Sequence, residues 1–128
     1  MKKIIFTSNA PEPIGPYSQA VLTNDILYIS GQIAIDPNTQ TYVPQGIEEE
    51  TTLVMKNLES ILKAADMSFA DVIKTSIFLA DMNDFATVNA IYSTYFTKDF
   101  PARETVEVSV LPKNSKVEIS MVAITSQK

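Results

Sequence analysis

Two charged residues near the C-terminus are the leading candidates for catalysis or ligand binding in this sequence. Arg103 is the only arginine, and Glu118 lies in the last β-rich run. A guanidinium binds a carboxylate through two hydrogen bonds, and a carboxylate positions and deprotonates a water molecule. We predict that residues 103–110 and 116–124 form adjacent antiparallel strands, so the two side chains meet if the register puts them on one face. The spacing alone favours a plain cross-strand salt bridge, worth about 0.2–1 kcal/mol.

The absence of two residue types narrows the chemistry further. The 128-residue chain has no cysteine and no histidine. This composition excludes a thiolate nucleophile, a Ser-His-Asp triad, a histidine base and metal sites built on either residue. The formal net charge is −5, which disfavours binding to phosphate backbones or anionic lipid. Carboxylate, guanidinium, hydroxyl and backbone groups remain to carry out a reaction.

A loop and a lone glycine supply the other candidates. Residues 9–17 contain three prolines and a glycine and end in Tyr17, whose ring and hydroxyl either contact a ligand or, in a plain surface loop, pack on its own strand. At Ser30-Gly31 the missing side chain of Gly31 lets a ligand approach the backbone, although a plain β-bulge is the commoner reason for such a glycine.

Two acidic clusters are better explained by structure than by catalysis. We interpret Glu48–Glu50 as the solvated first turn of a helix, where negative charge favours the helix dipole. We interpret Asp81, Asn83 and Asp84 as helix caps rather than as metal ligands.

Hydrophobic periodicity predicts an alternating order of strands and helices. The expected elements are strands at 3–6, 19–23 and 26–30, a helix at 47–65, a strand at 72–80, a helix from the caps to about 96, and strands at 103–110 and 116–124. Asn24-Asp25 suits a two-residue hairpin, Gly31 suits a bulge, and residues 36–38 suit a turn.

Two helices are enough to cover one face of one sheet. We therefore expect an α+β fold in one domain over residues 1–128, with the other sheet face covered by another subunit. No apolar run approaches the ~20 residues of a membrane-spanning helix, and no apolar signal region follows Lys2-Lys3. We expect a cytoplasmic protein without a membrane segment.

At this point the sequence resembles the Rid/YjgF family along nearly its whole length. The matching motifs are Pro13-Ile14-Gly15-Pro16-Tyr17-Ser18-Gln19-Ala20, Ile29-Ser30-Gly31-Gln32, Asn83-Asp84-Phe85-Ala86-Thr87-Val88-Asn89, Pro101-Ala102-Arg103, Leu111-Pro112-Lys113 and Lys116-Val117-Glu118-Ile119. The resemblance implies a chorismate-mutase-like mixed sheet with two helices on one face and a homotrimer with clefts between subunits.

The resemblance also implies an activity, namely hydrolysis of reactive 2-imino acids released by pyridoxal-phosphate enzymes to 2-keto acids and ammonia. It implies that Arg103 holds the substrate carboxylate and that Glu118 orients the attacking water. The residues expected to line the cleft are Tyr17, Ser30, Gly31 and Thr105. No cofactor and no metal are implied, and the expected partner is a small 2-imino acid rather than a nucleic acid.

Three residues depart from the family pattern. Glu104 stands where a small residue is usual, Ser120 where a second glutamate is frequent, and Asp66 where a helix-terminating glycine is common. Glu104 is expected to point away from the face of Arg103 and either disturb a subunit contact or pair with a lysine. Two other functions stay open: a non-catalytic module that binds small carboxylates or acts like a chaperone, and a ribonuclease or translation inhibitor, which the acidic balance disfavours.

Overall fold

The strands of the molecule form one large mixed sheet and one short hairpin. The computed structural model describes residues 1–125, and residues 126–128 of the expected domain lie outside the described part. The strands are β1 (Lys2–Ile5), β2 (Ala20–Thr23), β3 (Ile26–Gln32), β4 (Ile35–Asp36), β5 (Thr41–Tyr42), β6 (Val72–Leu79), β7 (Ala102–Glu107) and β8 (Val117–Ile124). The α-helices are α1 (Ile47–Ala64) and α2 (Phe85–Ser93). Among residues 1–125, no helix has the length and hydrophobicity needed to cross a membrane.

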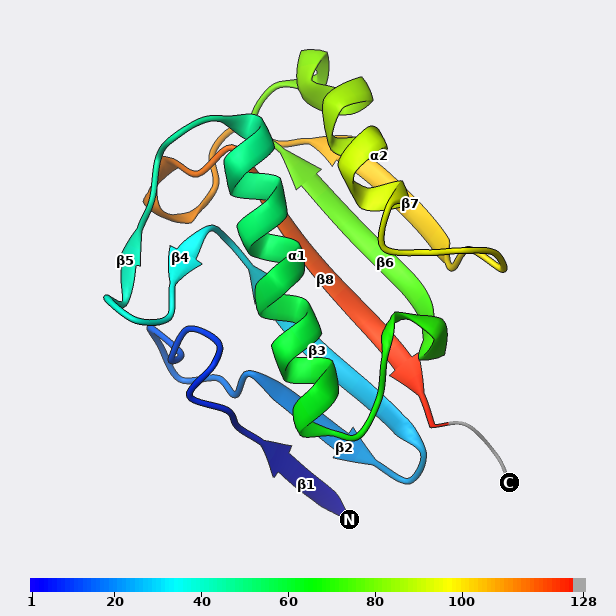
Figure 1. Ribbon diagram of the computed structural model, residues 1–128. Helices are drawn as coiled ribbons and strands as arrows, with labels where there is room; N and C mark the ends of the chain where they lie inside the picture. Colours follow the sequence, from blue (N-terminus) through cyan, green and yellow to red (C-terminus); the bar gives the residue numbers. More distant parts are fainter. Residues whose placement is uncertain (126–128) are drawn as a thin grey trace.

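The large sheet has the strand order β1-β2-β3-β8-β6-β7, and β4 and β5 pair beside it. β6 and β7 run parallel, whereas the other neighbouring strands of the large sheet are antiparallel. Both helices lie on the same face of this sheet (Figure 1). The expectation of a mixed α+β fold with two helices on one face is confirmed.

The core lies between the helices and this sheet face. α1 buries Thr51, Val54, Leu58, Ile61 and Leu62, which recur at helical spacing and so lie on one side of the helix. Strands β6 and β8 meet them with alternate buried residues: Thr75, Ile77 and Leu79 on β6, and Val117, Ile119, Met121 and Ala123 on β8. This alternation fixes which face every other strand residue occupies, because side chains along a strand point to opposite faces in turn.

The hairpin and the bulge form where the sequence places them. Asn24 has a left-handed φ of 53° in the turn between β2 and β3, a conformation that asparagine tolerates better than most residues. The register between β3 and β8 shifts between Ile29 and Gln32, which confirms a bulge at Ser30-Gly31. The bulge lies at the C-terminal end of β3, shortly before β4 begins.

The predicted pairing of residues 103–110 with residues 116–124 is wrong. β7 pairs in parallel with β6, and β8 lies between β3 and β6, so two strands that follow each other in the chain are not neighbours in the sheet. The physical reason is the β6-α2-β7 crossover, which places β7 at the sheet edge, while β8 fills the gap that the N-terminal strands and β6 leave. Sequence adjacency does not determine this choice.

The interpretation of Glu50 as a solvated residue is also wrong. Glu48 and Glu49 are exposed, but Glu50 is only 1% exposed. Its carboxylate accepts hydrogen bonds from the Tyr42 hydroxyl at 2.8 Å and from the Lys116 backbone N–H at 3.1 Å. Burial and the Glu50 carboxylate raise the pKa of Tyr42 to about 12. Glu50 thus ties α1 to β5 and to the start of β8.

The second helix begins and ends differently from the expectation. The Asp81 side chain accepts from the Asn83 N–H and caps a short 3₁₀ turn, whereas Asp84, which precedes α2, makes no side-chain cap. α2 ends at Ser93, short of the expected residue 96. Aromatic side chains pack together at the C-terminal end of α2, where the ring centroids of Tyr92 and Phe96 are 4.8 Å apart.

Asp66 ends α1 in a conformation that costs free energy. Its φ is 59°, and the N–H groups of Asp66 and Met67 donate to the Lys63 and Leu62 carbonyls in a Schellman arrangement. We expect Asp66→Gly to stabilise the protein by about 0.5–1 kcal/mol, because glycine adopts this conformation without steric penalty. Urea unfolding checks this, with Lys63→Gly on the helical last turn as a matched control that should destabilise. A loss of stability in Asp66→Gly would refute the assignment of strain.

Candidate active site

A hollow of about 320 Å³ opens where the loop before β2 meets the bulge of β3 and the start of β8. Four of the six residues expected to form the site line it: Tyr17, Ser30, Gly31 and Glu118. Much of the remaining lining is apolar, including Pro11, Ile14, Ile33, Ile35 and Pro112. The hollow therefore offers two carboxylates, those of Glu12 and Glu118, and a few hydroxyl and backbone groups in an apolar surround, which suits a small organic ligand.

The Glu118 carboxylate lies directly over Gly31. A Cβ atom added to Gly31 would meet Glu118 Oε2 at 2.1 Å and Cδ at 2.8 Å. Such distances are far inside van der Waals contact, so only glycine at this position leaves Glu118 where it is. The bulge and the carboxylate form one unit, which explains why a glycine interrupts an otherwise apolar strand.

Hydrogen bonds fix the two hydroxyl-bearing residues of the hollow. Ser30 Oγ donates to the Ser18 carbonyl at 2.6 Å, and the Ser30 N–H donates to the Gln19 carbonyl at 2.9 Å. The Tyr17 hydroxyl accepts from the Ile14 N–H at 3.2 Å, and its side chain is 47% exposed. This hydrogen bond between Tyr17 and Ile14 closes the C-terminal part of the proline-rich loop.

Gln19 organises this loop, and the sequence did not single it out. It is 2% exposed; its side-chain amide donates to the carbonyls of Thr7, Ala10 and Pro11, while its Oε1 accepts from the Thr7 N–H. A proline-rich loop has few N–H groups of its own to pair with its carbonyls. A glutamine at the loop's end was the available signal, because its amide supplies the missing donors.

Burial raises the pKa of the Glu118 carboxyl above its ordinary value of 4.5. As pH rises, an unfolded chain ionises this group first, so the folded state loses stability between the ordinary pKa and the raised one. We expect Glu118→Gln to have a higher urea midpoint than the wild type at about pH 7, with the difference vanishing at about pH 3 where both forms are neutral. Equal midpoints at neutral pH, or a difference that grows in acid, would contradict this result.

Arg103 and Thr105 lie outside this hollow. The Arg103 guanidinium packs against α2, with Cζ 5.1 Å from the centroid of the Tyr92 ring and 5.8 Å from that of the Phe85 ring. Thr105 is the next residue on the same side of β7, and its Oγ1 is buried without a hydrogen-bond partner among the described residues. The two residues form a second group on the helix side of the sheet.

The registers of β6 place Arg103 and Glu118 on opposite faces. Arg103 pairs with Thr75, which is buried under the helices, whereas Glu118 pairs with Phe78, three residues further along β6. An odd spacing along a strand means opposite faces. β6 also separates the two strands, so the backbones are two strand spacings apart, about 10 Å. Within one chain, the expected meeting of Arg103 and Glu118 does not occur.

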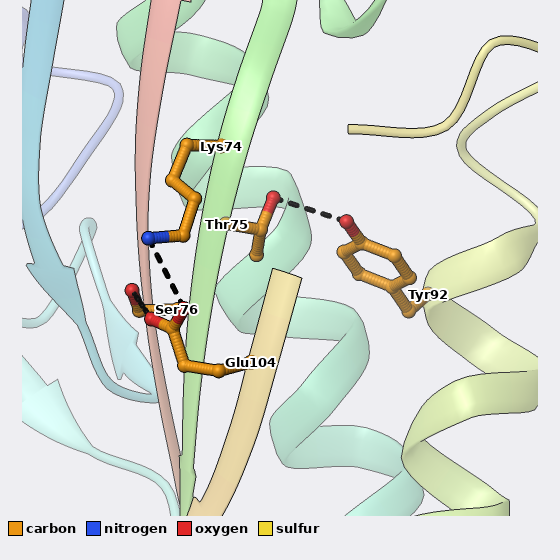
Figure 2. Close-up of polar contacts among 5 residues, drawn as sticks. All are labelled: Lys74, Thr75, Ser76, Tyr92 and Glu104. Carbon is orange, nitrogen blue, oxygen red and sulfur yellow. Dashed lines mark hydrogen bonds and ion pairs between the residues drawn. The ribbon is translucent and has the colours of Figure 1, made fainter. Parts of the chain in front are cut away.

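Glu104 occupies the face away from Arg103, as the strand alternation predicts. Figure 2 shows its carboxylate beside Lys74 and Ser76 on one side of β6, while Thr75 and Tyr92 meet on the other side. Glu104 Oε1 lies 3.1 Å from Lys74 Nζ, and Glu104 Oε2 accepts from the Ser76 hydroxyl. The hydrogen bond from Ser76, and to a smaller extent the contact with Lys74, lower the pKa of the Glu104 carboxyl. The expected pairing with a lysine is therefore present within the chain itself.

The fold and the hollow define a small α+β protein with a pocket in which the Glu118 carboxylate lies over a glycine, and known proteins share its sequence and fold. A family model described as Endoribonuclease L-PSP matches residues 7–125. The 2-iminobutanoate/2-iminopropanoate deaminase of Rattus norvegicus is 51% identical over 124 residues, which cover 97% of this chain and 90% of the rat protein.

Solved structures agree with this match. A protein of the conserved Rid family from Yersinia pestis is 48% identical with a TM-score of 0.95, over 98% of this chain and 100% of that one. TdcF of E. coli, solved with bound serine, is 39% identical with a TM-score of 0.92, over 97% of this chain and 99% of that one. The chain belongs to the Rid/YjgF family.

Proposed function

We propose that this chain hydrolyses 2-imino acids to 2-keto acids and ammonia, as a 2-iminobutanoate/2-iminopropanoate deaminase. The observation that carries the proposal is the 51% identity to curated deaminases over nearly the whole chain. The hollow adds chemical support, because it holds a partly buried carboxylate next to a glycine backbone. A relative solved with serine points the same way, since serine has the carboxylate and α-nitrogen of a 2-imino acid.

In this proposal Glu118 moves the protons of the reaction. It accepts a proton from water while the water oxygen bonds to C2 of the protonated imine and the C=N electron pair moves to nitrogen. Glu118 then returns the proton to that nitrogen, the C–N bond breaks, ammonia leaves, and the C2 hydroxyl gives up its proton to solvent as the keto group forms. The raised pKa of Glu118 suits both steps, because a group that titrates nearer neutrality both accepts and donates.

Arg103 is proposed to hold the substrate carboxylate with its guanidinium. Because Arg103 and Glu118 lie on opposite sheet faces of one chain, the proposal requires Arg103 of one copy to face Glu118 of another. We propose the homotrimer that the family resemblance implies, with the site in each cleft between subunits. Exposed apolar side chains on the helix-free sheet face support contact between copies: Ile4, Tyr28, Val106 and Ile124. Light scattering should give about three times the chain mass of 14.1 kDa.

The deciding experiment measures keto-acid release from an imine made in situ. Threonine dehydratase with threonine supplies 2-iminobutanoate, and semicarbazide traps the imine that escapes hydrolysis. Wild-type protein is expected to divert imine from the trap, and Arg103→Ala to lose at least about 100-fold in kcat/KM, because a charge-assisted carboxylate contact disappears. Arg103→Lys should keep the charge and recover only part of the rate.

Light scattering on each variant controls for loss of assembly. A wild-type rate equal to buffer across several imino acids would refute the deaminase function.

The ribonuclease alternative has little support in the geometry, since the residues that line the hollow include two glutamates and no lysine or arginine.

A further inference from the structure

Two aromatic rings hold the Arg103 guanidinium against α2. Its Cζ lies 5.1 Å from the Tyr92 ring centroid and 5.8 Å from the Phe85 ring centroid, both within the range of a cation–π contact. Phe85 and Tyr92 are two helical turns apart, so they project from the same side of α2. The guanidinium is therefore bounded by aromatic faces from one rigid element.

The Tyr92 ring, the more buried of the two, is itself fixed to the sheet. Figure 2 shows the Tyr92 hydroxyl reaching the Thr75 side chain, to which it donates a 3.0 Å hydrogen bond. Thr75 is fully buried, and it is the residue of β6 that stands opposite Arg103 in the parallel register. The ring that contacts the guanidinium is thus tied to the strand beside Arg103.

Arg103 has no acidic partner in the described part of the chain. Across residues 1–125, no carboxylate lies within ion-pair distance of its guanidinium, and the guanidinium donates no hydrogen bond. The adjacent Glu104 is on the other face with Lys74, and Glu107 accepts from the Met82 N–H. The donor groups of Arg103 remain free for a ligand.

We propose that Phe85 and Tyr92 are positioning residues for the carboxylate receptor Arg103, with Thr75 fixing Tyr92. The inference rests on the proposed function and deepens it. A carboxylate that held Arg103 in place would compete with the substrate for its N–H groups. Aromatic faces hold the planar cation from the side and leave its edges, where the donors lie, to the substrate carboxylate. The receptor is kept in one orientation without being neutralised.

Phe85 gives the sharper test, because it is 38% exposed and its replacement spares the core. Phe85→Leu is expected to raise KM for 2-iminobutanoate, and Kd for the product 2-ketobutanoate by calorimetry, about three- to tenfold. We expect kcat to stay within about twofold, because the ring contributes to carboxylate binding and not to the proton transfers. Phe85→Tyr keeps an aromatic face and should restore wild-type values. Met82→Leu, at the same 38% exposure three residues earlier, is the matched control.

The outcomes separate the inference from the function on which it rests. Turnover by the wild type with unchanged KM and Kd in Phe85→Leu refutes the positioning role and leaves the deaminase intact. The same holds if Met82→Leu raises KM equally, or if Phe85→Tyr fails to restore binding. A wild type without turnover refutes the deaminase, while a Kd for 2-ketobutanoate that depends on the Phe85 ring still supports the positioning role.

Discussion

Mixing two inactive variants is expected to restore about one quarter of the wild-type activity. Arg103→Ala lacks the proposed carboxylate receptor, and Glu118→Gln lacks the proposed base. If each site takes Arg103 from one copy and Glu118 from a neighbour, random mixing in equal amounts leaves about one site in four intact. The variants are unfolded together in urea, refolded by dilution, and assayed with 2-iminobutanoate.

The double variant Arg103→Ala/Glu118→Gln provides the control. Mixed with either single variant, it supplies no chain that could complete a site, so activity should stay at the level of the single variants. Wild-type protein taken through the same refolding sets the full value. A mixture of the two single variants that remains inactive would show that the two residues act from the same chain or not at all, and would overturn the arrangement proposed for the site.

Gly31→Ala is expected to lower kcat by about 10²-fold, because its new methyl group occupies the position of the Glu118 carboxylate. A displacement of about 1 Å in a catalytic group is enough for a loss of this size. The measurement is steady-state kinetics with 2-iminobutanoate together with the unfolding midpoint. Binding of 2-ketobutanoate should change much less than kcat, because Arg103 is untouched.

Gly15→Ala is the matched control for that substitution. A Cβ at Gly15 meets only ring carbons of Tyr17, the nearest at 3.4 Å, which is ordinary contact. We expect its activity to stay within about threefold of wild type, because a surface substitution without a clash is usually nearly neutral. A Gly31→Ala enzyme as active as Gly15→Ala would show that the position of Glu118 over the bulge does not matter for the reaction.

Local features of the chain could be predicted because short-range physics determines them. The Asn24-Asp25 hairpin, the bulge at Gly31 and the bounds of α1 follow from turn chemistry, a missing side chain and a helical apolar stripe. The predicted alternation along β7 is also confirmed, since Glu104 and Arg103 point to different faces of the sheet. Each of these depends on residues close in sequence.

The strand order and the burial of Glu50 could not be predicted in the same way. Nothing local to β7 and β8 indicates that β6 separates them, because strand order is decided by how the whole sheet buries its apolar face. Glu50 looks like its exposed neighbours Glu48 and Glu49 until Tyr42 and the Lys116 N–H are brought to it by the fold. Tertiary partners, rather than composition, decided that burial.

The placement of Arg103 and Glu118 on opposite sheet faces determines whether a newly synthesised chain can be active before it assembles. Under the proposed roles, a lone folded chain presents a carboxylate receptor on one side and a base on the other, with the sheet between them. Under these roles the chain becomes active only when it associates with other copies. The catalytic rate per chain therefore follows mass action, and it falls when the protein is diluted below the dissociation constant of the assembly. Abundance then sets the onset of activity as well as its amount.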